Sequence, residues 1–440
     1  MALPYLPILF ESFWRDEAFA VLIARHQPLQ IIQLMMKDQS PPLYFLLLHY
    51  WMQWFGIGEA PVRMLSYILF LGILVATFVF SWKIMKTIPG RLVFLGLLYL
   101  NPFLLQYAFE ARPYALFAFT TIVAAAALGF NQLFIASIFL ALGILSHNFA
   151  VFVTAAIFVW FVWTRYKTWK TSIKDFFLLF TLPALTFLAW SGAIFQQVAR
   201  VSASFWITEK TSAMYYYLFT SFTTGSIWFK THDILQFFSV TLLVLGAAPL
   251  IMSFIKKETI SPWTKLAVCI SLIPIICTYI VSHFKTPIYY DRYLIASLPF
   301  VFLLMAQGIE KLIKEGSIAW KIFLCLFVYA YALSLLLAYQ DIQQASTKPA
   351  INWAVGQALQ RAKPQDMIIS ESDLNFLETK WYTLNNPLHI KAHIVSPSGT
   401  IPYYIGAAAI EPGDVIKSIP PHTTVWVIQQ NGGYHKEVTK

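Results

Sequence analysis

Charged and polar side chains capable of chemistry stand in four clusters along a chain that is otherwise strongly hydrophobic. The first cluster combines WRDE at residues 14–17 with DQSPPLY at 38–44, and the others are EARPY at 110–114, SHN at 146–148 and YYDRY at 289–293. Charged groups at membrane depth are costly and usually mark function. Arginine holds phosphate through its bidentate fork. The EARPY and YYDRY clusters therefore favour a phosphorylated ligand, and the tyrosines of YYDRY would suit an isoprenoid neck.

Each cluster taken alone also has a structural interpretation. The acidic pair Asp16 and Glu17 would complement the dipole at the start of a helix. Arg112 would extend toward lipid headgroups, and His147 is of a type that more often packs than binds a ligand. Residues 289–293 would form an interfacial aromatic belt with an Arg–Asp pair. The individual signals are weak, so their order and their shared side of the membrane carry most of the information.

The composition places these clusters in a membrane protein. The chain has 440 residues, of which 58% are hydrophobic and 12% charged, whereas soluble domains carry about 25% charged residues. Long apolar runs recur, and roughly 20 apolar residues cross the hydrocarbon core. The net charge of +10 does not indicate nucleic-acid binding, because the basic residues are spread over short loops. The 3 cysteines lie in apolar runs and imply no disulfide framework.

The basic residues also predict the topology. They concentrate in four short loops, at 83–91, 165–174, 256–265 and 311–321, which the positive-inside rule assigns to the cytoplasm. All four polar clusters then face the outer side of the membrane. The predicted transmembrane helices are 63–82, 92–109, 113–130, 132–147, 149–164, 175–195, 234–254, 264–283, 293–309 and 319–339. The segments expected outside are 11–62, 110–112, 146–148, 196–233, 285–292 and the chain after residue 340.

Residues 1–339 are predicted to form a transmembrane domain whose first outer loop, 11–62, carries the first polar cluster. Between its two polar motifs this loop is expected to carry a helix lying on the membrane surface, followed by an amphipathic stretch from Leu43 to Trp54. Residues 214–229, rich in aromatics, are expected as interfacial helices. The stretch MALPYLPILF is too short to cross the membrane, so either the true start lies upstream or the first helix is truncated.

Residues 340–440 are predicted to form a small α/β domain outside the membrane, because Pro, Asn, Asp and Gly return there to ordinary frequency. An amphipathic helix is expected up to Arg361, and NGG is expected to form a turn. The predicted strands are 366–370, 389–396, 414–418 and 423–430. The expected fold is a polytopic α-helical membrane protein of about 10–11 transmembrane helices with this small domain attached.

Five motifs together resemble a known family. They are WRDEAF, D-x-x-P-P-L-Y-F-L-L-L-H-Y-W, F-G-x-x-E-x-x-x-R ending at Arg63, EARPYAL and D-R-Y-L-x-x-x-L-P. The chain resembles the lipid-dependent membrane glycosyltransferases of the GT-C class and is similar to the protein O-mannosyltransferase and aminoarabinose transferase group (glycosyltransferase family 39). The resemblance covers most of residues 11–300, and the first two motifs carry nearly all of its specificity.

The resemblance implies an enzyme of the cell membrane that moves a sugar, of the mannose or aminoarabinose class, from a polyprenyl-phosphate carrier. The acceptor would be a glycolipid, a polysaccharide or a protein on the outer face, and one in-line displacement would invert the anomeric carbon. Asp16 is implied as general base and Glu17 as the residue that orients Asp16 or the acceptor. The residues implied to grip the donor phosphate are Arg112, Arg292 and Lys285, and the supporting residues are Asp38, Arg63, Glu110, His147 and Tyr293.

Two further expectations concern this site. The sequence pattern does not identify a cofactor. A divalent cation is a candidate because some members bind a metal just ahead of the paired prolines, but Ser40 occupies that slot here. Arg63 lies four residues after Glu59, which also fits a structural tie along one helix.

Three other functions compete with this interpretation. A transporter or flippase for a lipid-linked substrate would show internal repeats and charges near mid-membrane, and neither is evident. An O-antigen polymerase or ligase has the same broad fold class but a very long outer loop in its second half, whereas 196–233 is modest. A non-catalytic scaffold that binds envelope components through 340–440 would not require Asp16 or Arg112.

Overall fold

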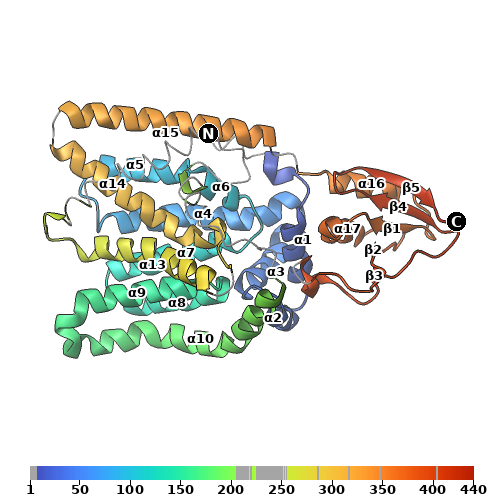
Figure 1. Ribbon diagram of the computed structural model, residues 1–440, viewed down its shortest axis with the longest axis horizontal. Coiled ribbons are helices and arrows are strands. Elements are labelled where there is room, and N and C mark those ends of the chain that lie inside the picture. The colour runs from blue at the N-terminus through green and yellow to red at the C-terminus, as the bar shows by residue number, and fades with distance from the viewer. Residues whose placement is uncertain are drawn as a thin grey trace.

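The computed structural model describes residues 7–204, 218, 221–223, 251, 253, 255–284, 287–315, 318–345, 348–402 and 405–440. Figure 1 shows a bundle of helices lying side by side, with a small domain built on a β-sheet beyond one end of it. Three shorter helices, α1, α2 and α3, lie at that end, between the bundle and the sheet. The predicted class, a polytopic helical protein with a small C-terminal sheet domain, is confirmed.

The bundle is built from long apolar helices. Among the described residues, four segments are long and apolar enough to cross a membrane, or five if one bent pair is counted as a span. The four are Glu59–Ser81, Ala150–Arg200, Pro262–Phe284 and Asp291–Lys311. The helices are α4 (Glu59–Ser81), α5 (Ile88–Tyr99), α6 (Pro102–Ala108), α7 (Tyr114–Gly129), α8 (Leu133–Ser146), α9 (Ala150–Arg165), α10 (Trp169–Ser204), α13 (Pro262–Phe284), α14 (Leu298–Glu315) and α15 (Ile318–Ala345).

Three predicted helices differ from the structure. The one expected at 293–309 is a 3-10 helix, η4 (Asp291–Ser297), followed by α14. The expected helix 92–109 is broken into α5 and α6, which meet at a bend of 60°. Asn101 causes the break because its side chain accepts a hydrogen bond from the Leu104 backbone N–H and Pro102 opens the new helix. The helix expected at 175–195 is longer at both ends in the structure, where it is α10. Pro183 lies inside α10 and does not end it. The helix expected at 234–254 and the interfacial helices at 214–229 lie almost wholly outside the described residues.

The surface helix expected between the two motifs of the first loop is two helices. α1 covers Arg15–Ala24 and α2 covers Pro28–Lys37. The chain turns between them because Pro28, which has no backbone N–H to continue α1, takes the first position of α2. The amphipathic stretch after the paired prolines is α3, Leu43–Phe55. Ahead of α1, residues Pro7–Phe10 form a short 3-10 helix, η2.

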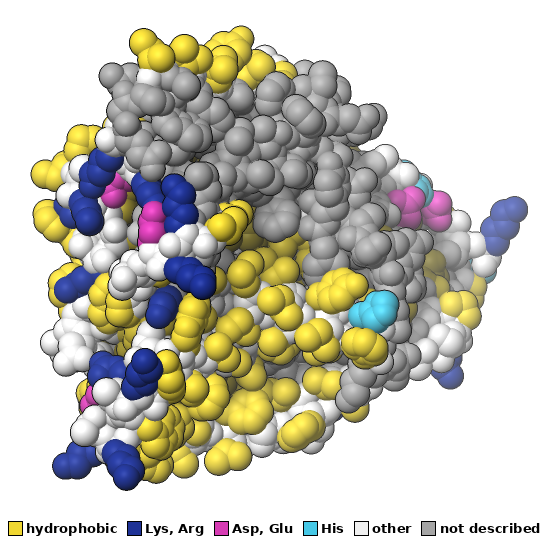
Figure 2. Space-filling model, turned by 60° about the vertical axis from the view of Figure 1, so that its left-hand side comes forward, with side chains coloured by type: hydrophobic (Ala, Val, Ile, Leu, Met, Phe, Trp, Pro, Cys, Tyr) yellow, Lys and Arg dark blue, Asp and Glu magenta, His cyan; other side chains and the backbone are white. Residues whose placement is uncertain are grey.

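The two ends of the bundle differ in charge. The connections that follow α4, α9 and α14 carry the clustered lysines and arginines and lie at the end away from the sheet. Figure 2 shows these dark blue side chains gathered along one end of the molecule, with a broad hydrophobic face beside them. The EARPY, SHN and YYDRY clusters lie at the other end of the bundle, each directly before or after a helix. The structure therefore separates the basic loops from the polar clusters, as the topology prediction requires.

The C-terminal domain is a five-stranded sheet with helices on it. The strand order is β3-β2-β1-β4-β5, in which β5 is antiparallel to β4 and the other neighbours are parallel. The predicted strands and the predicted helix α16 are present, whereas α17 and β5 were not predicted. The elements are α16 (Ile351–Arg361), β1 (Met367–Ser370), α17 (Phe376–Thr383), β2 (Ala392–Val395), β3 (Val415–Ile416), β4 (Thr424–Ile428) and β5 (Tyr434–Val438).

The C-terminal domain and the surface helices share one hydrophobic core. Phe19 of α1, Phe45 of α3 and Leu377 of α17 belong to the same buried cluster. Gly406 allows part of this close approach, because its backbone φ of 103° favours glycine and a Cβ there would lie 2.7 Å from the Phe19 ring. Helix α17 therefore packs directly on α1, the helix that carries Asp16.

Candidate active site at the N-terminus of helix α1

The carboxylate of Asp16 lies between two arginines that come from distant parts of the chain. Its Oδ2 atom is 3.3 Å from Nη2 of Arg112 and 3.7 Å from Nη2 of Arg292. Its Oδ1 atom is 3.5 Å from Nε of Arg15. The Asp16 side chain is 15% exposed, so the group is sheltered but accessible. Burial alone would raise the pKa of Asp16, but the charges of Arg112, Arg292 and Arg15 outweigh it and lower the pKa.

The neighbouring carboxylate of Glu17 is fully buried and fixes the start of α1. Arg63 donates two hydrogen bonds to it, Nε to Oε1 at 2.8 Å and Nη2 to Oε2 at 2.5 Å. The Ala111 backbone N–H and Lys348 Nζ also donate to Glu17, at 3.1 and 3.2 Å. Burial opposes ionisation, but Lys348 and Arg63 lower the pKa of Glu17 to about 2. Asp16, one residue earlier, is thereby held in a fixed place.

Arg63 corrects one expectation. It does not pair with Glu59 as predicted, because its guanidinium group pairs with Glu17 instead. The same group donates hydrogen bonds to four backbone carbonyls ahead of α1, those of Ile8, Leu9, Glu11 and Ser12. Glu59 instead accepts hydrogen bonds from Tyr382 and Asn352 of the C-terminal domain. A fully buried arginine requires this many acceptors, which the chain ahead of α1 supplies.

The two arginines at Asp16 keep unused donors. The Nε atoms of Arg112 and Arg292 are buried and have no hydrogen-bond partner. Arg112 donates to the Tyr114 hydroxyl at 3.2 Å, and both guanidinium groups stand 5.5 Å from the centre of the Tyr114 ring. Arg292 also stands 4.6 Å from the Tyr290 ring and 5.8 Å from the Tyr293 ring. Buried polar groups are usually paired, so unpaired donors here indicate room for an anionic ligand.

Two further carboxyl groups border the site. Asp38 follows α2, is buried, and accepts from the Gln39 backbone N–H at 2.6 Å. Burial raises the pKa of Asp38 to about 6. Glu110 lies in the turn before Arg112, and burial raises its pKa to about 7 although Lys348 opposes the shift. Its Oε2 atom is buried without a hydrogen-bond partner. The site therefore contains carboxyl groups whose affinities for a proton differ widely.

His147 takes a packing position. Its ring stacks on Phe117 at 4.9 Å between centres and lies 5.4 Å from the Tyr293 ring. Its Nδ1 atom accepts a hydrogen bond from the Phe149 backbone N–H. Burial and the nearby arginines lower the pKa of His147 to about 3, so the ring is neutral. His147 and Tyr293 form the aromatic floor beside the arginines.

The second polar motif of the first loop is anchored to the bundle by amide groups. Asn148 Nδ2 donates to the Gln39 carbonyl and to Gln197 Oε1, both at 3.0 Å. Gln197 Nε2 donates in turn to the Met35 carbonyl at 3.0 Å. Residues 35–39 are thus fixed to the ends of α8 and α10, which positions Asp38.

Of the sequence-predicted site residues, Asp16, Arg112 and Arg292 converge, and the supporting residues surround them. Lys285 lies outside the described residues. Within the described part of the chain, no group of three or more His, Cys, Asp or Glu side chains is placed to hold a metal ion. Three cationic groups border Asp16. Because like charges repel, that side chain does not fit a cation site.

The C-terminal domain contributes residues that sequence reasoning missed. Lys348 reaches Glu17, and the Tyr382 hydroxyl accepts a hydrogen bond from the Phe13 backbone N–H at 2.7 Å. Glu378 on α17 lies close enough to Arg15 and Asp16 for their charges to act on it. The only signal in the sequence was local, a Glu followed at helical spacing by Trp and Tyr in LETKWYT.

The architecture described above is the GT-C membrane fold, as comparison with solved structures shows. ArnT from Cupriavidus metallidurans in the apo state has a TM-score of 0.62 and 10% identity, with 96% of this chain and 91% of that chain covered. The same protein bound to undecaprenyl phosphate has a TM-score of 0.60 and 12% identity, with 97% and 91% covered.

A more distant structure shares the fold over part of its length. The archaeal oligosaccharyltransferase AglB from Archaeoglobus fulgidus, in complex with an inhibitory peptide and a dolichol-phosphate, has a TM-score of 0.51 and 12% identity. The match covers 87% of this chain and 61% of that chain. No protein-family model and no curated protein matches the sequence.

Proposed function

We propose that the protein is a membrane glycosyltransferase that takes a sugar from a polyprenyl-phosphate donor and transfers it to an acceptor hydroxyl, with inversion. The observation that carries this proposal is the convergence of Arg112 and Arg292 on the sheltered carboxylate of Asp16. The lipid phosphates bound to ArnT and AglB, which have the same fold, support a donor of this chemical class.

The two arginines are suited to the donor phosphate. Their Nε atoms are free of protein partners, and a phosphate would supply the acceptors that these donors lack. The phosphate becomes the leaving group, on which negative charge grows as the bond to the anomeric carbon breaks. Fixed positive groups aimed at that charge stabilise the transition state more than the ground state. Tyr290 and Tyr293 flank Arg292 and would contact the isoprenoid neck.

Asp16 would act as the general base. It would take the proton of the acceptor hydroxyl while the hydroxyl oxygen attacks the anomeric carbon from the side opposite the phosphate. In the ligand-free site the arginines lower the pKa of Asp16. A bound phosphate would share those positive charges, so the pKa of Asp16 would rise and its carboxylate would become a stronger base when the donor is present.

Glu17 is assigned a positioning role in this proposal. Its oxygens are bound by Arg63, Lys348 and the Ala111 N–H, so it holds the first turn of α1 and does not touch the acceptor. Asp38 and Glu110 would tune the charge around the donor phosphate. No step is routed through a metal ion.

The charge distribution of the protein supports one orientation in the membrane. The positive-inside rule places the basic end of the bundle in the cytoplasm, so the active site and the domain formed by 340–440 would lie outside the cell membrane. Residues 1–339 would form the transferase domain. A donor carrying a mannose- or aminoarabinose-like sugar and an acceptor that is a glycolipid, polysaccharide or protein fit this arrangement.

The test does not require the acceptor to be identified first. Purified protein in lipid would be supplied with a panel of polyprenyl-phosphate sugars and an extract of envelope components, and release of polyprenyl phosphate would be measured. Wild-type protein should release it from one donor, and Asp16→Asn should lose about 10²–10⁴-fold in rate, the usual contribution of a general base. Equal release by both proteins would remove Asp16 as base. Donor binding without release by wild type would favour a transporter.

A further inference from the structure

Glu378 of the C-terminal domain has an environment unlike that of an ordinary surface carboxyl. It lies in the first turn of α17, is 7% exposed, and its Oε2 atom is buried without a hydrogen-bond partner. Its carboxyl faces the Arg15 backbone N–H and the charges of Arg15 and Asp16. Buried polar atoms usually have a hydrogen-bond partner, so this oxygen is available to bind a ligand.

The face of α17 that carries Glu378 is pressed against the transferase domain. Residues 378, 381 and 382 follow the i, i+3, i+4 spacing that places side chains on one side of α17, which ends at Thr383. Trp381 contacts the Phe13 ring at 5.9 Å between centres. Tyr382 is held between the Phe13 N–H and Glu59, to which it donates at 2.9 Å. The position of Glu378 beside Asp16 is therefore set by a rigid contact.

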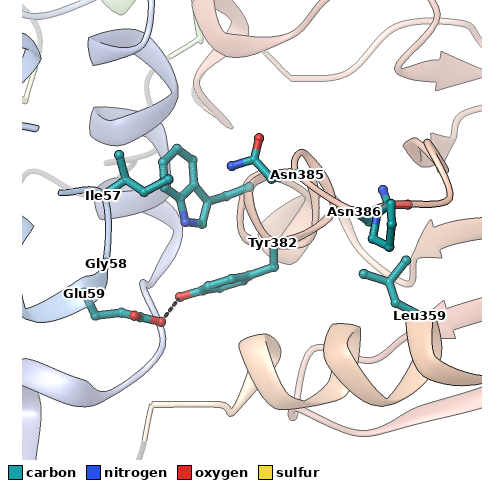
Figure 3. A pocket seen from close by; sticks show the side chains of 9 residues that line it. Ile57, Gly58, Glu59, Leu359, Tyr382, Asn385 and Asn386 are labelled. Atoms are coloured by element: carbon teal, nitrogen blue, oxygen red, sulfur yellow. Dashed lines mark hydrogen bonds between the residues drawn. The ribbon is translucent and has the colours of Figure 1, made fainter. Parts of the chain in front are cut away.

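A cleft of about 340 Å³ opens at the C-terminal end of α17, and Trp381 and Tyr382 belong to its lining. Figure 3 shows Tyr382 and Asn385 on one side of it and Ile57, Gly58 and Glu59 on the other, and Trp381 is also part of the lining. Asn385 is exposed, and an indole, a phenol and an amide are groups that present a flat surface and hydrogen-bond partners together. A sugar ring, which has both an apolar face and hydroxyl groups, matches this lining.

We propose that Glu378 belongs to the acceptor subsite, where it hydrogen-bonds a hydroxyl next to the one that Asp16 deprotonates, and that the cleft beyond the end of α17 binds a further part of the same saccharide acceptor. The inference rests on the proposed function and adds to it the chemical class of the acceptor and a residue that binds the acceptor. The acceptor would thus be bound between the two domains, and the C-terminal domain would be part of the active site.

The alternative role for Glu378 is a cap for α1, since a carboxylate near a helix N-terminus is favourable. A cap must be ionised to gain most from the dipole. Burial instead raises the pKa of Glu378 to about 8 although Arg15 opposes the shift, so the group is protonated at neutral pH. A protonated carboxyl both donates and accepts a hydrogen bond, as a vicinal pair of sugar hydroxyls requires.

The experiment measures the acceptor dependence of polyprenyl-phosphate release for wild type, Glu378→Ala, Glu378→Gln and Asn385→Ala. Glu437→Gln is the matched control, because Glu437 is an exposed carboxylate of the same domain on β5. Binding of undecaprenyl phosphate to each variant is measured alongside. We expect Glu378→Ala to raise the acceptor concentration for half-maximal rate about tenfold, the loss of one or two hydrogen bonds, with donor affinity unchanged. Glu378→Gln, which still donates and accepts, should stay within about threefold of wild type.

The possible outcomes separate the two proposals. If wild type releases no polyprenyl phosphate with any acceptor, the proposed function fails and the acceptor subsite fails with it. If wild type is active and Glu378→Ala has an unchanged acceptor dependence, only the subsite is wrong. A loss of donor affinity together with a lower unfolding temperature in Glu378→Ala would also contradict the subsite, because it would identify Glu378 as a cap for α1.

Discussion

Arg112 and Asp16 are separated by 96 positions in the chain, yet Nη2 of the arginine lies 3.3 Å from Oδ2 of the aspartate. The contact joins the turn before α7 to the first turn of α1, and Arg292 approaches the same oxygen from beside α14. Both guanidinium groups also keep a buried Nε atom without a hydrogen-bond partner. These donors favour a second anion beside Asp16, and we expect that anion to be the donor phosphate.

Removing either arginine should weaken donor binding. We expect Arg112→Met and Arg292→Met each to weaken undecaprenyl phosphate binding about 10- to 100-fold, because each loses charge-assisted hydrogen bonds. Arg112→Lys should recover only part of this, since an ammonium group lacks the planar fork. Arg361→Gln is a suitable control, because Arg361 is exposed on α16. Unchanged affinity in both Met variants would assign the two arginines to structure alone.

Donor binding should depend on pH through Glu110. Burial raises the pKa of Glu110 to about 7, so the group is neutral at pH 6 and carries a negative charge at pH 8. That charge repels a phosphate, so Glu110→Gln should bind undecaprenyl phosphate about three- to tenfold more tightly than wild type at pH 8 and equally at pH 6. The comparison at each pH cancels the ionisation of the phosphate itself. Identical pH profiles for the two proteins would exclude this role.

The same group predicts a change in stability. Because the folded-state pKa of Glu110 is above its ordinary value of 4.5, ionisation disfavours the folded state. The penalty is absent below pH 4.5, grows as the pH rises toward 7, and is complete above it. Glu110→Gln should therefore raise the unfolding temperature at pH 8 but not at pH 4.5. A gain of the same size at both values would point to a cause other than this titration.

The buried pair of Glu17 and Arg63 should be necessary for the fold of the first loop. Arg63→Met removes the strongest partner of a fully buried carboxylate, and breaking such a pair costs about 3–5 kcal/mol. Thermal unfolding in lipid should show the loss, whereas Lys348→Met should cost less because Arg63 remains. The double variant Glu17→Gln with Arg63→Met should be less damaging than the sum of the single changes. Strict additivity would mean that the two side chains are not coupled.

The sequence predicted the helical class and the separation of basic loops from polar clusters, because hydropathy and charge are properties of single segments. That residues of these clusters share one site was implied by the family resemblance. The sequence did not predict that Arg63 pairs with Glu17, since spacing pointed to Glu59 on the same helix. The contact depends on how α1 crosses the end of α4. Tertiary packing therefore decided the acidic partner of Arg63, against the partner that spacing along one helix predicted.

The contribution of the C-terminal domain to the site also could not be predicted from the sequence. Lys348 and Glu378 are more than 300 positions from Glu17 and Asp16, and each is an ordinary residue in its local sequence. Only the shared core between α1 and α17 brings them to the site. The break between α5 and α6, by contrast, had a local signal in Asn101-Pro102, which is a typical start of a helix.

The most direct measurement of the central claim compares Asp16→Asn with wild type in two assays on one preparation. The first is the affinity for undecaprenyl phosphate, and the second is the rate of polyprenyl-phosphate release in a single turnover. If Asp16 is the base beside the phosphate, the variant should bind the lipid phosphate at least as tightly as wild type, because a competing negative charge is gone, while its release rate falls about 10²-fold or more. Weaker binding with a proportionate loss of rate would contradict the account, because Asp16 would then serve only to hold the arginines in place.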